Sequence, residues 1–155
     1  MLNTLTLLNV TFFMTFGCHT KIHDKGLLTL QEKNLLLTNI DGEIYHVHAG
    51  KDKVYLKQLE GCIIYIEGSR LMKHVFVDEW IIQDAGSGSA PFVGPLKREG
   101  IQWTLFDHNT KSVLILEDVE KFITPNEHDI VLIGGYVVGP QRLKVISAKI
   151  LVGEE

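Results

Sequence analysis

Short runs of β-branched and aromatic residues, separated by polar turns, dominate the chain from about residue 34 onward. This spacing is typical of β-strands rather than helices. The turn-forming pairs Asp41-Gly42 and Ala49-Gly50 predict hairpin connections between neighbouring runs. The pattern predicts strands at residues 35–38, 43–48, 53–56, 62–67, 74–82, 102–106, 112–116, 130–134, 136–138 and 143–151.

Helical spacing is rare in the same region. Residues 117–122 are predicted to form one or two helical turns, because Val119 and Phe122 fall on one face and Pro125 follows shortly after. Residues 24–33 fit either a helix or an extended tether, and the pattern does not decide between them.

The order and spacing of these runs recur in the two halves of the chain. We match Tyr45 with Trp103, and the segments 53–54, 63–68 and 75–82 with 111–113, 130–135 and 143–150. A stretch of small residues at 85–91 has the composition of a linker. These features predict two β units, at 34–84 and 92–152; the alternative is a chance similarity between two strand-rich halves.

Each unit has up to five short strands, and the strand before the last contains a glycine, Gly68 or Gly135. This pattern resembles the OB-fold, a five-stranded Greek-key barrel, and in particular the small barrels of exported bacterial proteins. The resemblance implies an all-β protein made of two tandem five-stranded OB-like barrels, with the two glycines at barrel corners. A single β-sandwich is the competing architecture.

Residues 1–17 contain no Lys, Arg, Asp, Glu or His, and they end at the segment Thr15-Phe16-Gly17-Cys18. This stretch resembles a bacterial lipoprotein signal peptide. The resemblance implies removal of residues 1–17, lipid attachment at Cys18, a tether over 18–33 and a location on the periplasmic side of a membrane. Thr15 stands where the family prefers an aliphatic residue, and no basic residue follows Met1. The alternative is a cytoplasmic protein in which residues 5–16 belong to the core.

Composition narrows the class of protein. The chain has 155 residues, of which 45% are hydrophobic and 22% charged, so it is not a disordered protein. Its net charge of −4 lacks the broad cationic field that non-specific nucleic-acid binding requires. Two cysteines cannot form a network of disulfides, so burial of apolar side chains must stabilise the fold.

Histidine supplies the candidate metal ligands, and His19 and His23, four residues apart beside Cys18, are a further pair. His46 and His48 are two residues apart on a predicted strand, so both rings face the same side, as in some zinc sites. Further ligands would have to come from Glu43, His74 or Asp78. The alternative interpretation is a pair of solvent-facing histidines on either side of Val47.

The sequence shows no catalytic pattern. Ser87 and Ser89 lie in the linker rather than at a strand-to-helix turn, and there is no phosphate-binding glycine loop. We therefore expect a non-catalytic binding or scaffold module of the cell envelope that needs no cofactor and presents its barrels to a protein partner or small ligand. The alternative is an OB-fold protein that binds oligosaccharide or single-stranded nucleic acid, although export would keep nucleic acid away. The candidate ligand or partner surface consists of Tyr45, Tyr55, Trp103 and Phe106.

Overall fold

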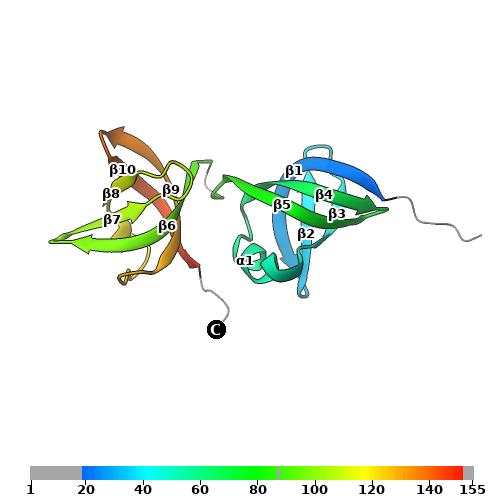
Figure 1. Ribbon diagram of the computed structural model, residues 1–155, viewed down its shortest axis with the longest axis horizontal. Coiled ribbons are helices and arrows are strands. Elements are labelled where there is room, and N and C mark those ends of the chain that lie inside the picture. The colour runs from blue at the N-terminus through cyan, green and yellow to red at the C-terminus, as the bar shows by residue number, and fades with distance from the viewer. Residues whose placement is uncertain (1–18, 87, 152–155) are drawn as a thin grey trace, which may run out of the picture.

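The computed structural model describes residues 19–86 and 88–151 (Figure 1). The first unit contains β1 (Thr20–Gln31), β2 (Asn34–Asn39), β3 (Ile44–His48), the 3₁₀ turn η1 (Gly50–Asp52), α1 (Lys53–Gln58), β4 (Ile63–Leu71) and β5 (His74–Asp84). The second unit contains β6 (Ala90–Glu99), β7 (Gln102–Phe106), β8 (Val113–Glu117), the 3₁₀ turn η2 (Val119–Lys121), β9 (Ile130–Gly139) and β10 (Arg142–Leu151).

Each unit is one five-stranded sheet that closes on itself. The strand order is β1-β2-β3-β5-β4 in the first unit, and β4 pairs back with β1. The second unit has the same order, β6-β7-β8-β10-β9, and β9 pairs back with β6. The third and fifth strands of each unit run parallel, whereas the other neighbours are antiparallel. The chain therefore has two tandem OB-like barrels, as the sequence predicted, and not a single sandwich.

The first strand of each unit was missed by the strand pattern. β1 occupies residues assigned to a tether or a helix, and β6 begins inside the expected linker. Both strands change partners along their length: the start of β1 pairs with β4 and its end with β2, and β6 divides in the same way between β9 and β7. A glycine marks each change of partner, Gly26 in β1 and Gly94 in β6, and it places no apolar side chain at an inward-facing position.

These glycines are required because two strands approach closely at each barrel corner. A Cβ atom at Gly26 would lie 2.2 Å from the carbonyl oxygen of Thr38, and one at Gly94 would lie 1.9 Å from that of Phe106. Gly68 and Gly135 lie at the second corner of each unit, where the corresponding distances are 2.0 and 2.4 Å to the carbonyl oxygens of the fifth strand. The barrel-corner positions expected for Gly68 and Gly135 are confirmed.

The repeat is real, but part of the sequence match was displaced by one strand. Tyr45 lies on β3, the third strand of its unit, whereas Trp103 lies on β7, a second strand whose counterpart is β2. The matches of 63–68 with 130–135 and of 75–82 with 143–150 are correct, since they pair β4 with β9 and β5 with β10.

The predicted strand at 53–56 is the start of helix α1. Leu56 and Leu59 are three residues apart and both are fully buried, which is helical spacing that extends beyond the predicted strand. In the second unit, the turn η2 takes the place of α1 inside the predicted helical segment 117–122.

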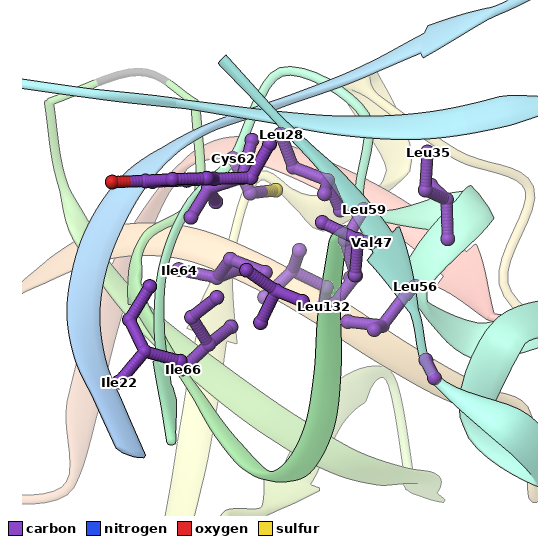
Figure 2. Close-up of a cluster of buried hydrophobic side chains, with 14 of the residues drawn as sticks. Ile22, Leu28, Leu35, Val47, Leu56, Leu59, Cys62, Ile64, Ile66 and Leu132 are labelled. Atoms are coloured by element: carbon purple, nitrogen blue, oxygen red, sulfur yellow. The ribbon is translucent and has the colours of Figure 1, made fainter. Parts of the chain in front are cut away.

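The two barrels share part of a core. Val131 and Ile133 of β9 point into the core of the second barrel. Leu132, between them on the opposite face of the strand, belongs to the core cluster of the first barrel together with Leu151. Figure 2 shows Leu132 among side chains of the first unit, such as Ile64 and Val47. The continuous buried run of β9 is therefore a strand with apolar neighbours on both faces.

Leu132→Ala is expected to lower the free energy of unfolding by about 2 kcal/mol, because it removes buried methyl groups from the contact between the barrels. Urea denaturation followed by tryptophan fluorescence measures the change. Val137→Ala is the control, since Val137 lies on the same strand and is 58% exposed. Equal stability of the two variants would mean that the shared core contributes little.

Candidate functional site

Four ring-bearing side chains lie together on the outer surface of the first barrel, on β3 and β5. Along β3 the side chain of Val47 is buried, whereas His46 and His48 face outward. β5 runs parallel to β3, and its register places His74 opposite His46 and Phe76 opposite His48. We call these four residues the ring face.

Neighbouring rings of this face contact one another in space. His46 stacks on His74 with ring centroids 5.2 Å apart, and His48 stacks on Phe76 at 4.9 Å with an interplanar angle of 18°. Nε2 of His48 lies 2.9 Å from Nδ1 of His74, so one ring donates a hydrogen bond to the other. His19, just before β1, extends the series, because its ring lies 5.7 Å from that of Phe76.

The surroundings of His48 favour its neutral form. Partial burial lowers the pKa of His48, and the neighbouring His74, His46 and Lys53 lower it further, because each disfavours another positive charge nearby. At this position the ring face therefore offers a stacking surface and a hydrogen-bonding nitrogen rather than a cation at neutral pH.

The second barrel uses the same positions differently. The parallel register of β8 and β10 places Ile115 opposite Arg142, where the first barrel has His46 opposite His74. In place of ring contacts, the guanidinium of Arg142 forms an ion pair with Glu117 at 2.5 Å, and the ammonium of Lys144 binds the carboxylate of Asp118. Because these charged groups bind each other, the same surface of the second barrel is an internal ion-pair network.

Two of the four aromatic residues predicted to form a ligand or partner surface are buried. The Tyr45 ring is in the core of the first barrel, and its hydroxyl donates a hydrogen bond to the Glu43 carboxylate. This bond, together with burial, raises the pKa of Tyr45 to about 12. Trp103 is buried in the second barrel, where its indole N–H donates to Glu120 at 2.9 Å. These rings serve the cores and cannot stack on a ligand.

The other two predicted residues are exposed but lie apart. Tyr55 is on α1 of the first unit, whereas Phe106 ends β7 of the second, beside His108. The expected surface of four aromatic residues is therefore not formed. The sequence considered His74 only as a possible further metal ligand and did not select Phe76. Both have a local signal, because they flank the buried Val75 on β5 and so share one face. They approach β3 because β3 and β5 are neighbouring parallel strands. A pairing between strands that are distant in sequence is not visible in the local pattern.

The predicted ligand set for a metal does not assemble. Among residues 19–86 and 88–151, no group of three or more His, Cys, Asp or Glu side chains could hold a metal ion. The Glu43 carboxylate accepts the hydroxyl of Tyr45 instead, and of the three proposed further ligands His74 alone reaches His48. Cys18, the predicted lipid attachment site, lies outside the described residues.

No helix within the described part of the chain has the length and apolar character needed to cross a membrane. Comparison with known proteins finds no family model and no curated protein that matches this chain.

Proposed function

We propose that the protein is a non-catalytic binding module of the bacterial cell envelope, and that it binds a protein partner through the ring face of its first barrel. The observation that carries this proposal is the cluster of stacked, outward-facing rings on β3 and β5. In OB-folds the usual binding face lies on the second and third strands, and the ring face shares the third strand, β3, with it.

The chemistry of the ring face suits a partner that inserts apolar or aromatic side chains. Phe76 is 39% exposed. Burial of this apolar ring against a partner would be energetically favourable. The imidazole of His48, which is stacked on Phe76 and has a lowered pKa, adds hydrogen-bonding nitrogens without a positive charge at neutral pH. Rigid rings flanked by polar atoms are typical of the residues that contribute most to protein interfaces.

A lipid at Cys18 would place this face at the membrane surface. β1 begins at Thr20, two residues after Cys18, so a chain anchored there has no tether between the lipid and the first barrel. His19 lies beside Phe76, so the ring face adjoins the point of attachment. We therefore expect the partner to lie at the same membrane surface.

Binding of an oligosaccharide or a single nucleic-acid strand is the second candidate, because flat exposed rings also stack on sugars and bases. A net charge of −4 argues against nucleic acid. Titration of the purified chain with an oligosaccharide panel and with oligo(dT), followed by fluorescence anisotropy, separates this candidate from a protein partner.

A photo-crosslinking amino acid at position 46, introduced in cells of the source organism, is expected to yield a discrete protein adduct. The control is the same probe at position 115, the equivalent place in the second barrel, where no adduct is expected. Phe76→Ala in the chain that carries the position-46 probe is expected to reduce the adduct several-fold. Phe106→Ala, which removes a ring of similar exposure on the other barrel, is expected to leave it unchanged.

Identical adducts from positions 46 and 115 would contradict the proposal, as would an adduct that is insensitive to Phe76→Ala. Either result would show that contact with the partner does not involve the ring face.

A further inference from the structure

We infer that His48 and His74 form a two-imidazole chelate for a divalent transition-metal ion, with Cu²⁺ preferred. The sequence suggested the pair His46 and His48 on one strand, whereas the structure brings together nitrogens on two different strands. This inference does not depend on the proposed binding partner, because the chelate is a property of the purified chain.

The backbone positions the two ligands before any ion arrives. β3 and β5 are paired in a closed sheet, and the register puts His74 next to β3 at the point where His46 and His48 face outward. The two imidazoles lose little freedom on binding, since their Cα atoms are already held by the sheet and the His48 ring is stacked against Phe76.

The two facing nitrogens are close enough to serve one ion. Nε2 of His48 and Nδ1 of His74 are 2.9 Å apart in their hydrogen bond, and a small turn of the rings would direct both lone pairs at one ion. The preference for Cu²⁺ follows from its chemistry, because imidazole nitrogen binds Cu²⁺ more tightly than Ni²⁺ or Zn²⁺.

The exchange between hydrogen bond and metal requires no proton to leave the pair. In the hydrogen bond, one ring nitrogen carries the proton and the other accepts it. When an ion binds, that proton moves to the remaining nitrogen of its own ring, and both facing nitrogens turn their lone pairs toward the ion. Water completes the coordination.

The test is a titration of the untagged full-length chain, purified in detergent, with Cu²⁺ and separately with Ni²⁺ and Zn²⁺ by isothermal calorimetry. We expect one Cu²⁺ per chain, with an electron paramagnetic resonance spectrum that shows two equatorial nitrogen ligands. His48→Gln and His74→Gln should each weaken Cu²⁺ binding at least about tenfold. The control is His108→Gln, which removes an exposed histidine beside a phenylalanine in the second barrel and should leave the affinity unchanged.

Equal Cu²⁺ affinity of the wild-type chain, His48→Gln and His74→Gln would overturn the inference, as would the absence of binding at micromolar Cu²⁺. Circular dichroism of each variant checks that these exposed substitutions leave the barrels folded. Failure of the metal test leaves the crosslinking test of the ring face intact, and the reverse also holds.

Discussion

Gly68→Ala is expected to lower the free energy of unfolding by about 3 kcal/mol, a large fraction of the stability of an ordinary domain. The added Cβ would lie 2.0 Å from the carbonyl oxygen of Phe76, far inside van der Waals contact. That oxygen belongs to the paired strand β5, so relief requires the backbone of β4 or β5 to move. Because Phe76 also carries the ring face, the same movement should disturb the candidate site.

Urea denaturation monitored by circular dichroism measures the decrease in the free energy of unfolding. Gly135→Ala tests the equivalent corner of the second barrel, where the new Cβ would lie 2.4 Å from the carbonyl oxygen of Lys144. The control is Gly139→Ala on the same strand, because its Cβ would meet nothing closer than a side-chain atom of Arg142 at 4.0 Å. Similar stability of Gly68→Ala and Gly139→Ala would show that the corner accommodates a methyl group.

Asp107→Ala is expected to lower the free energy of unfolding by about 3 kcal/mol, because it removes three hydrogen bonds to a buried carboxylate. The carboxylate accepts the backbone N–H of Val93 at 3.0 Å and both the N–H and the hydroxyl of Thr110 at 2.8 and 2.7 Å. These bonds connect the end of β7 to β6 and to the turn before β8. The side chain is only 1% exposed, so water cannot replace all of them.

Thermal and urea denaturation give the size of the effect. The control is Asp129→Ala, which removes a more exposed carboxylate that accepts hydrogen bonds from Asn126 within a single turn, and which should cost about 1 kcal/mol or less. Equal losses from the two substitutions would contradict a special role for Asp107.

The contribution of Asp107 should also depend on pH. Burial by itself raises the pKa of this carboxyl, but the hydrogen bonds from Thr110, Val93 and Asn109 outweigh burial and lower the pKa below that of an unfolded aspartate. A lowered pKa stabilises the fold above the unfolded value of about 3.9, and this stabilisation disappears as the pH falls through the folded value. The stability difference between wild type and Asp107→Asn should therefore be constant near neutral pH and shrink below about pH 4.

The local sequence pattern was sufficient to predict most strands, because apolar and polar residues alternate along them as buried and exposed positions do. Tyr45 and Val47 alternate with outward-facing neighbours on β3, as do the buried leucines of β2. It failed for β1 and β6, because the inward-facing positions where these strands change partner are occupied by Gly26 and Gly94, which give no apolar signal in the sequence.

The sequence could identify only part of the candidate site, for a related reason. The exposure of His46 and His48 follows from alternation along one strand, so the sequence could select them. The contact between His48 and His74 depends on the pairing of β3 with β5, which are separated by α1 and β4 along the chain. The same alternation puts Tyr45 on the inner face of β3, and the prediction of Tyr45 and Trp103 as surface rings was wrong.

The sequence alone determined that this chain is all-β, that it is a duplication, and that glycine is needed at the corners marked by Gly68 and Gly135. These properties depend on residue type and on spacing between near neighbours. Tertiary structure decided the closure of each sheet, the insertion of Leu132 into the core of the other barrel, and the assembly of the ring face. Those features arise from contacts between residues distant in sequence, and their geometry is set only when the strands have paired.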